Sequence, residues 1–367
     1  MKITGLIKDI DLELFLSALL LSIIGVITIY SATHQISGSK TTLDMIFYKN
    51  YYIKQFMWMF AGIIFMLIFS RIEYRILVEI SYKLYVVVLI LLVAVFIFGR
   101  IRMGSQRWFH MGPISFQPSE LTKIVIVLTI VRFLSDKKGK VGVVEGLIKS
   151  LLIVAIPMIL IIKQPDLGTA LLFIPVVIIL LYIIGVRMKY IYYIIGSLIV
   201  FFPFFLFLLK DYQRQRLLVF LNPWLDPLGS GYNIIQSQIA IGSGGILGKG
   251  FLKGTQSQLN FIPSHHTDFI FSVLSEEFGL IGAVVLIIIY IVFILRGIKI
   301  AMKARDIAGS LLAAGITVMF AFQVIININM AIGLLPVVGV PLPFISYGGS
   351  SLFINMIAVG ILLNIRR

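Results

Sequence analysis

Residues 167–184 read LGTALLFIPVVIILLYII, a stretch without a charged side chain. An α-helix rises about 1.5 Å per residue, so about 20 apolar residues are needed to cross a hydrocarbon core of about 30 Å. This stretch is close to that length, and comparable stretches recur along the 367-residue chain. The sequence therefore predicts a helical membrane protein.

The composition of the whole chain supports this fold class. Apolar residues make up 59% of it and charged residues 13%, against about 45–50% and about 25% in soluble domains. A soluble protein of this size would need more charge on its surface, which excludes soluble and disordered proteins. The chain has a net charge of +15, and its basic residues lie between the apolar stretches without forming a single stripe. This distribution therefore indicates membrane topology and no nucleic-acid partner.

The apolar stretches predict an all-α polytopic membrane protein with about ten spans in a single domain, residues 1–367. The expected spans are Leu12–Ser31, Gln55–Ser70, Tyr82–Phe98, Leu121–Leu134, Leu147–Ile162, Leu167–Ile184, Ile191–Leu209, Phe269–Leu295, Ala308–Ile332 and Phe344–Leu363. The first is too long for a signal peptide and shows no clear cleavage site, so it is expected to be retained.

The loops between the spans differ in charge and in length. Lysine and arginine are more frequent in the loops on the side of the N-terminus, which predicts that both termini are cytoplasmic. The longest loop, about residues 210–267, lies between spans seven and eight and is expected outside. A segment of that length between packed helices is usually functional. A second outer stretch, Arg100–Pro118, is predicted to be irregular.

Ionisable side chains at membrane depth are costly and indicate function by default. Glu120 and Lys123 are three residues apart on one helix face, which predicts an ion pair that is either a structural clamp or a contact with substrate. Asp166 precedes a span and suits a helix N-cap, or the orientation of a group in a cavity. Arg107 and Trp108 either anchor the outer stretch at headgroup level or, for the arginine, bind a diphosphate.

Asp268 is the sharpest candidate for a catalytic group, because it lies where the long loop enters span eight. On a helix, Ser272 and Ser275 fall near its face and Glu276 about 80° away. A carboxylate backed by hydroxyls and a second acid is suited to general-base catalysis. The alternative is a helix N-cap. His266 and Asp268 could also supply two metal ligands, which is a weak signal.

Two glycine-rich stretches remain. Ile241–Gly254 (IGSGGILGKGFLKG) lacks the spacing of a phosphate-binding loop, because Ser243 stands where the Walker pattern needs glycine. It is expected to form a compact surface loop or a re-entrant loop. Leu334–Ser351 is rich in proline and glycine, which predicts non-helical backbone lining a cavity at membrane depth. There the hydroxyls of Ser346 and Ser350 could bind phosphate or sugar.

Four motifs, in order along nearly the whole chain, together resemble the SEDS family. They are Arg107-Trp108 with Gln117-Pro118-Ser119-Glu120-Leu121-Thr122-Lys123; Gln164-Pro165-Asp166-Leu167-Gly168-Thr169; His266-Thr267-Asp268-Phe269-Ile270-Phe271 with Glu276-Glu277-Phe278-Gly279; and Pro341-Leu342-Pro343-Phe344-Ile345-Ser346-Tyr347-Gly348-Gly349-Ser350-Ser351. The chain is similar to the RodA branch, since the division branch, FtsW, commonly has lysine near Val338. The family usually has glutamate where Ser264 stands, so a role for an acid there is not expected.

The resemblance implies a peptidoglycan glycosyltransferase that polymerises lipid II at the outer face of the bacterial cytoplasmic membrane during elongation and shape maintenance. It implies that Asp268 is the essential aspartate and that Trp108 is important for activity. The candidate substrate contacts are Arg107, Trp108, Glu120, Lys123, Asp166, Ser346 and Ser350. A divalent cation, Mg²⁺ or Mn²⁺, is a further candidate for binding the diphosphate.

Two other functions stay open. A lipid II flippase needs a polar path to both faces, whereas the unusual polar groups here lie towards the outer side. A non-catalytic scaffold for a penicillin-binding protein would need no base.

The expected partners are a class B penicillin-binding protein and the elongation machinery, because the chain has no Ser-x-x-Lys accompanied by the Lys-Thr-Gly of transpeptidases. Small residues favour close approach of helices in lipid, so the docking face is predicted on spans eight and nine. Those residues are Gly279, Gly282, Ala283, Ala308, Ala313, Ala314 and Gly315.

Overall fold

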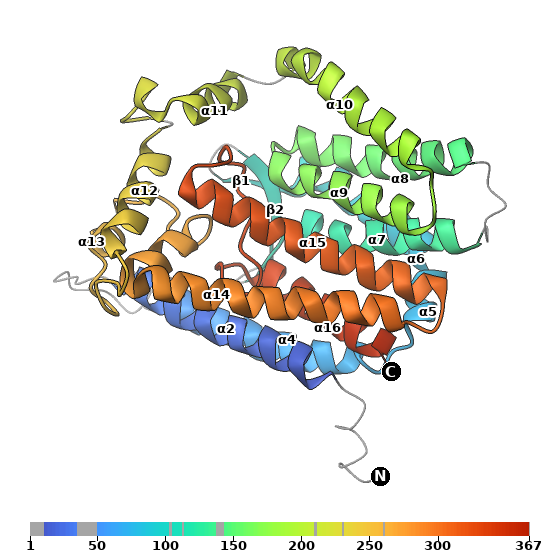
Figure 1. The fold of residues 1–367 in the computed structure, drawn as a ribbon, viewed down its shortest axis with the longest axis horizontal. Coiled ribbons are helices and arrows are strands. Elements are labelled where there is room, and N and C mark those ends of the chain that lie inside the picture. Colours follow the sequence, from blue (N-terminus) through green and yellow to red (C-terminus); the bar gives the residue numbers. More distant parts are fainter. Residues whose placement is uncertain are drawn as a thin grey trace, which may run out of the picture.

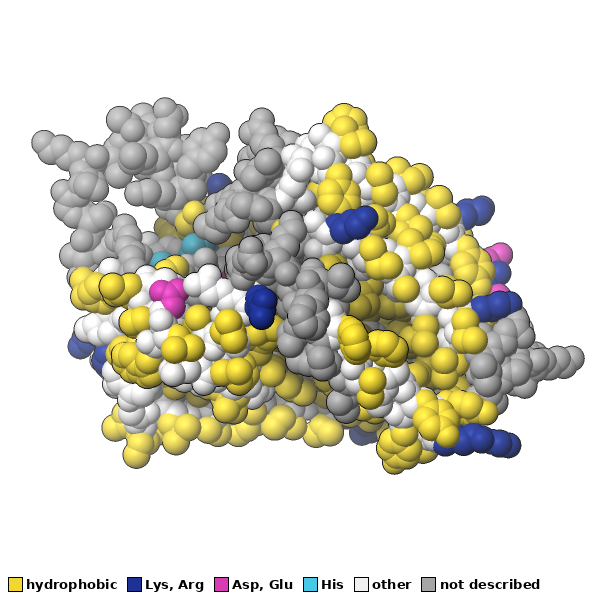
Figure 2. Space-filling view, turned by 90° about the horizontal axis from the view of Figure 1, so that it is seen from above, with side chains coloured by type: hydrophobic (Ala, Val, Ile, Leu, Met, Phe, Trp, Pro, Cys, Tyr) yellow, Lys and Arg dark blue, Asp and Glu magenta, His cyan; other side chains and the backbone are white. Residues whose placement is uncertain are grey.

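A computed structural model describes residues 11–34, 50–102, 105–111, 114–136, 143–208, 211–229, 231–259 and 261–366. Long helices run in roughly one direction through the molecule, and the C-terminus lies at the same end as the short helix α5 (Tyr74–Glu79) (Figure 1). The flank of this bundle that faces the viewer in Figure 2 is covered largely by hydrophobic side chains. This surface is what a protein surrounded by lipid requires.

Each of the ten predicted spans overlaps a helix. These helices are α2 (Leu12–Thr33), α4 (Tyr51–Phe69), α6 (Ser81–Phe98), α7 (Pro118–Asp136), α8 (Val143–Lys163), α9 (Leu167–Ile183), α10 (Met188–Leu208), α14 (Ile270–Lys303), α15 (Ile307–Ile332) and α16 (Gly349–Arg366). Among the described residues, seven helices are long and apolar enough to cross a membrane. The chain is therefore a polytopic, all-α membrane protein.

The core lies between helices that are far apart in the sequence. α14 packs on α15 and α2, α16 packs on α4, and α15 also packs on α9 and α7. Close approach depends on small residues such as Gly25 of α2, where an added Cβ would lie 2.6 Å from the carbonyl oxygen of Phe344. Small residues let helix backbones approach closely, which favours helix association in lipid.

The stretch Arg100–Pro118 is not irregular, so that prediction is wrong. It forms a small antiparallel sheet of β1 (Arg100–Arg102), β2 (Ser105–Met111) and β3 (Ile114–Phe116). Phe109 pairs with Phe116 between β2 and β3. β1 and β3 have three residues each, and the seven residues of β2 show no regular alternation of polar and apolar side chains, so no period of two stands out in the sequence.

The long loop also contains regular structure. Its elements are α11 (Asp211–Leu221), a 3₁₀ turn η1 (Pro223–Leu225), α12 (Tyr232–Gly244) and α13 (Thr255–Gln258). The glycine-rich stretch therefore begins inside α12 and only then becomes a loop. The last predicted span also starts later than expected, at Gly349, because residues 344–348 form a turn in which Phe344 has a φ of 66°.

Helix α14 is interrupted at Gly279, whose φ of 64° and ψ of −162° are not helical. An interruption leaves backbone groups without helical partners, and in lipid each such group costs several kcal/mol. Residues of the long loop supply the partners. The bonds run from the Lys249 amide to the Glu276 carbonyl (3.0 Å), from Gly250 to Glu277 (2.9 Å), from Leu280 to Gly245 (2.9 Å) and from Ile281 to Ile246 (3.2 Å).

The residues 244–250, here called the glycine segment, are thus the part of the long loop that completes α14. The backbones approach so closely that a Cβ on Gly248 would overlap the carbonyl of Glu277. Gly248 also has a φ of 81°, which favours glycine. These glycines serve backbone-to-backbone packing and do not form a phosphate-binding loop.

Candidate active site

Asp268 lies in the turn that joins the long loop to α14. The amides of Thr267 and Asp268 both donate to the carbonyl of Ser264, at 3.0 Å and 3.1 Å. The N-cap residue of α14 is Phe269, with no side-chain cap bond. Asp268 is partly buried and lies one residue before the N-cap position, and both interpretations of its side chain, general base and cap, stay predictions.

The backbone around Asp268 is fixed by two side chains from distant elements. Asn327 of α15 is fully buried, and its amide nitrogen donates to the carbonyl of Asp268 at 2.9 Å and to that of Val340 at 2.8 Å. The Ser346 hydroxyl donates to the carbonyl of Thr267 at 2.6 Å and accepts from the Leu342 amide at 2.8 Å. Asp268 is therefore held between α15 and the segment that precedes α16.

The carboxylate of Asp268 faces this same segment. Gly339 has a φ of 72°, and a Cβ added to it would lie 3.8 Å from Oδ2 of Asp268. The bulk of any larger side chain at Gly339 would thus reach the carboxylate. The expected non-helical backbone at Leu334–Ser351 is confirmed for residues 333–348, which separate α15 from α16.

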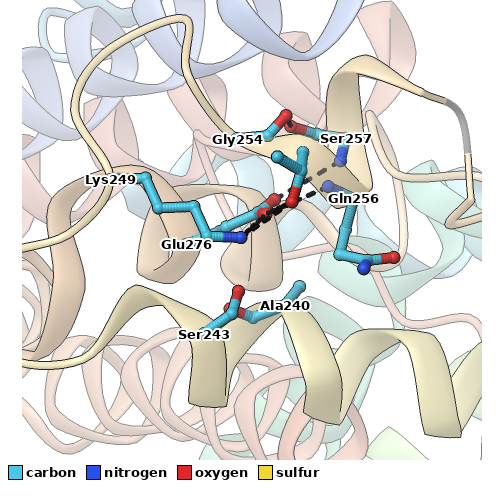
Figure 3. A network of polar contacts seen from close by, with 8 residues as sticks. Ala240, Ser243, Lys249, Gly254, Gln256, Ser257 and Glu276 are labelled. Atoms are coloured by element: carbon cyan, nitrogen blue, oxygen red, sulfur yellow. Dashed lines mark hydrogen bonds and ion pairs between the residues drawn. The ribbon is translucent and has the colours of Figure 1, made fainter.

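The predicted backing of Asp268 by Glu276 is wrong, and Ser272 contacts another serine; backing by Ser275 stays a prediction. The Ser272 hydroxyl lies 2.6 Å from that of Ser237 on α12. Glu276 is fully buried and accepts from Lys249 Nζ at 2.7 Å and from the amides of Gln256 and Ser257 at 3.0 Å and 3.3 Å (Figure 3). The helix directs these side chains towards α12 and α13, so Glu276 organises the long loop.

A second cluster of polar side chains surrounds Asp166. Its carboxylate accepts from the Thr169 amide at 3.3 Å, which confirms the predicted N-cap of α9. The other oxygen accepts from Gln117 Nε2 at 3.2 Å and from the Ser119 hydroxyl at 3.3 Å. Asp166 is buried, so it joins the start of α7 to the start of α9.

Arg107 of β2 completes this cluster. Its guanidinium donates to the carbonyl of Gln164 at 2.8 Å and to that of Pro165, and one nitrogen lies 3.8 Å from Asp166. These contacts with backbone carbonyls were not expected from the sequence, which offered anchoring at the interface or binding of a diphosphate. Trp108, the next residue, is partly buried on the same strand.

The two clusters are neighbours in space. Gly168, in the first turn of α9, packs on the segment that carries Gly339, since a Cβ there would lie 2.6 Å from the carbonyl oxygen of Val338. Ser350 joins the start of α16 to β3 and to the residue before α7. Its hydroxyl donates to the carbonyl of Ser115 at 2.8 Å and accepts from the Gln117 amide at 3.3 Å. The structure thus gathers Asp268, Ser346, Asp166, Arg107 and Ser350 at one end of the bundle.

Ser346 and Ser350, the two serines predicted to bind substrate, form hydrogen bonds with backbone groups of the protein. Ser346 and Ser350 are each 4% exposed, and their hydroxyls bond to backbone groups. These bonds position the segments around Asp268. A direct contact of either hydroxyl with substrate stays a prediction.

Glu120 and Lys123 form the ion pair that their spacing predicts. Lys123 Nζ lies 2.8 Å from Oε2 of Glu120, and the two side chains are 1% and 3% exposed. Removal of two charges from water costs several kcal/mol per ion, which only a well-formed pair offsets. The geometry therefore favours the structural clamp, and the contact with substrate stays a prediction.

Three positioning residues were missed. Asn327 and Gln117 are uncharged, and nothing in the local sequence separates them from other amides in apolar surroundings. His265 places Nδ1 2.8 Å from the carbonyl of Ile262 and Nε2 2.8 Å from that of Ala32. His265 therefore joins the long loop to α2.

Among the described residues, no group of three histidines or acids is placed to hold a metal ion. His266 stacks on Tyr51 with ring centroids 4.8 Å apart. Mg²⁺ usually takes one or two protein carboxylates and completes its shell with water and substrate phosphates. Asp268 fits such a limited contribution, but these residues alone do not form a cation site.

The predicted docking face needs a correction. Ala313 and Ala314 are buried, and a Cβ on Gly315 would lie 2.6 Å from a methyl group of Val127 on α7. Ala313, Ala314 and Gly315 therefore serve packing inside the bundle, because α15 packs on α7 and α9. Gly282 of α14 is partly exposed.

Comparison with known proteins identifies the family. Residues 11–367 match the pattern of the FtsW, RodA and SpoVE proteins, described as cell cycle proteins. The chain belongs to this family, the SEDS family.

Several curated relatives cover most of this SEDS chain. The peptidoglycan glycosyltransferase MrdB of Escherichia coli is 44% identical over 83% of this chain and 82% of its own. The probable peptidoglycan glycosyltransferase FtsW of Geobacter metallireducens is 39% identical over 98% and 95%. Stage V sporulation protein E of Bacillus subtilis is 39% identical over 97% of both chains.

Solved structures agree with this assignment. A chain from a peptidoglycan synthase complex, reported for its coordination of polymerization and crosslinking, superposes with a TM-score of 0.81 at 28% identity over 97% of both chains. RodA of Thermus thermophilus superposes with a TM-score of 0.70 at 25% identity over 97% of this chain and 96% of its own. The SEDS fold is thus shared along nearly the whole length.

Proposed function

We propose that this chain polymerises lipid II into glycan strands and that the carboxylate of Asp268 is the general base. The class of reaction rests on the relatives, and the chain is a peptidoglycan glycosyltransferase of the SEDS family. The observation that carries the role of Asp268 is its placement. It is partly buried, lies one residue before the N-cap position of α14, and is held at its backbone by Asn327.

The chemistry requires one proton acceptor and one means of stabilising a leaving diphosphate. A sugar hydroxyl of the acceptor attacks the anomeric carbon of the donor, a carbon–oxygen bond forms, and the bond to the diphosphate breaks. Asp268 takes the hydroxyl proton, and the leaving group departs as undecaprenyl diphosphate. General-base catalysis contributes about 10²–10⁴-fold to such reactions.

Arg107 is the proposed group for the diphosphate. It lies on β2 at the same end of the bundle as Asp268, and its guanidinium now donates to two backbone carbonyls. A diphosphate is a stronger acceptor for a guanidinium than a carbonyl is, because it is negatively charged and can accept two parallel hydrogen bonds. Lys123 is less suited, since its charge is paired with buried Glu120. A divalent cation would add charge at the diphosphate.

The site is proposed to lie at the outer face of the bacterial cytoplasmic membrane, with both termini cytoplasmic. Several Lys and Arg side chains in Figure 2 lie towards the end where α5 and the C-terminus are found. Arg75, Arg296 and Arg366 all form ion pairs near this end. Because cytoplasmic loops carry an excess of positive residues, the opposite end, with Asp268, is the outer one.

A class B penicillin-binding protein and the elongation machinery are the proposed partners. The support is the similarity to a chain of a peptidoglycan synthase complex and the lack of transpeptidase motifs in this chain. The exposed side of α14 is the better docking face after the correction above. Its residues include Leu280, Ile281, Val284, Val285 and Ile288.

The test is incubation of the purified protein with fluorescent lipid II, followed by separation of polymer on a gel. Polymer from the wild type but not from Asp268→Ala is the expected result. A scaffold would give no polymer from either protein. A flippase would give no polymer but would move labelled lipid II across the bilayer of reconstituted vesicles.

A further inference from the structure

The segment of α11 and η1 in the long loop exposes an unusual row of apolar side chains. Leu218, Leu221, Trp224, Leu225 and Leu228 are 52%, 78%, 72%, 67% and 89% exposed. An exposed apolar patch of this kind marks a surface that something covers. We call these five residues the α11–η1 patch.

The segment that carries the patch has a defined local structure. The same helix has an inner side, where Val219 is 3% exposed. The turn after α11 is built by specific contacts, because Asn222 caps η1 through the amide of Trp224 at 3.1 Å and Gln215 donates to Asp226 at 3.1 Å. The segment therefore has a defined conformation with one side directed inwards and the patch directed out.

Nothing in the described part of the bundle covers the patch. α11 packs on η1, and η1 packs on α12. Figure 1 shows α11 standing apart from the bundle beyond the end of α10, with only residues 209 and 210 between the two helices. The patch is thus tied closely to the end of a predicted span.

The position and residue types favour a lipid surface as the occupant. α10 itself exposes Val200, Phe201 and Phe204 towards its last turns, so the patch follows closely in the chain on a helix whose exposed side is apolar. Arg214 is exposed on α11 and suits contact with phosphate headgroups. Tryptophan with leucine beside a cationic residue is typical of helices that lie in the membrane interface.

We propose that α11 and η1 form an interfacial anchor, with the α11–η1 patch buried among the headgroups and upper acyl chains of a phospholipid bilayer. Interfacial helices reach about 5–10 Å into this region. The anchor would hold the long loop at headgroup depth. It requires no catalytic activity and is independent of the proposed function.

The test uses the fluorescence of Trp224, one of three tryptophans in the chain. The full-length wild type and Trp224→Phe are reconstituted in nanodiscs of phosphatidylcholine with a quarter of phosphatidylglycerol. Part of the phosphatidylcholine carries bromine at acyl positions 6,7 or, in a second set, 11,12. The signal of Trp224 is the difference between the two proteins, which leaves Trp58 and Trp108 unchanged.

The expected result is strong quenching of the difference signal by shallow bromines, weaker quenching by deep ones, and little quenching by aqueous iodide. Leu225→Ser/Leu228→Ser should lose much of the shallow quenching. Leu259→Ser is the matched control, because Leu259 is also exposed in the long loop, at 62%, outside the patch, and it should not change the signal.

Efficient quenching by iodide with none by brominated lipid would overturn the proposal. It would leave the patch in water and make it a surface for a second copy or another protein. Equal loss of quenching in the Leu259 control would also contradict it, because the effect would then not be specific to the patch. Removal of phosphatidylglycerol tests the contribution of Arg214, and weaker shallow quenching is expected without it.

Discussion

The side-chain amide of Asn327 donates a 2.9 Å hydrogen bond to the backbone carbonyl of Asp268, although the two residues are 59 positions apart. The same nitrogen also donates at 2.8 Å to Val340, which lies beside the glycine that faces the carboxylate. One buried side chain thus sets the position of Asp268 relative to the segment opposite it. This relationship leads to the first two predictions.

Asp268→Ala is expected to abolish glycan polymer while the protein stays folded in the membrane. The N-cap position of α14 is occupied by Phe269, so we expect the helix to form without the Asp268 side chain. Loss of a general base costs about 10²–10⁴-fold in rate. Polymer yield on a gel and the melting temperature in detergent are the measurements. A near wild-type rate in the variant would remove Asp268 from the mechanism.

Asn327→Ala is expected to lower both stability and the rate of polymerisation. One buried and one partly buried carbonyl lose their donor, and a buried unsatisfied group costs about 1–3 kcal/mol. The matched control is Asn329→Ala, because the Asn329 side chain donates within its own helix, to the carbonyl of Ile325 at 2.7 Å, in exposed surroundings. The prediction fails if the two variants melt and polymerise alike.

Glu120 and Lys123 should behave as a coupled pair. Removal of one partner leaves a buried charge and costs about 3–5 kcal/mol, whereas removal of both is much milder. Glu120→Gln and Lys123→Met should each lower the melting temperature, and the double variant should recover part of the loss. Additive losses would contradict the pairing, and lost activity at full stability would indicate contact with substrate.

Gly248→Ala should destabilise the protein by more than the about 1–2 kcal/mol that a left-handed backbone costs an L-residue. Its φ is 81°, and the new Cβ would overlap the carbonyl of Glu277. The matched control is Gly242→Ala, where the Cβ has open space in α12. The control should be neutral or stabilising, because alanine favours helix by about 1 kcal/mol over glycine. The melting temperatures of the two variants, each compared with the wild type, test this prediction.

Asp306 should make stability fall at acid pH. Burial raises the pKa of this carboxyl, but hydrogen bonds from the Gly309 amide, Tyr74 and Arg75 outweigh burial and lower it. A lowered pKa contributes stability that is present above the unfolded value of about 3.9 and is lost as pH falls through the folded value.

Asp306→Asn keeps an acceptor for the cap of α15 but cannot ionise. At pH 7 it should melt below the wild type, and this difference should shrink as the pH falls below about 4. Melting temperatures between pH 7 and pH 3 provide the measurement. A constant difference over this range would show that the charge of Asp306 does not stabilise the fold.

The sequence by itself determined the features that depend on neighbouring residues. Apolar length placed a helix at each predicted span, because a segment in lipid must satisfy its own backbone. The pair of Glu120 and Lys123 and the cap by Asp166 were likewise predictable. Both arise within three residues of one chain segment, where helical geometry fixes which side chains meet.

Only the tertiary structure decided which distant segments hold the site. Asn327 reaches Asp268, and Ser346 reaches Thr267 across 79 positions, through contacts that no local periodicity encodes. The same reason explains the errors at Glu276 and Gly315. A helical pattern shows which residues share a face, but the packing of helices against each other decides what that face meets.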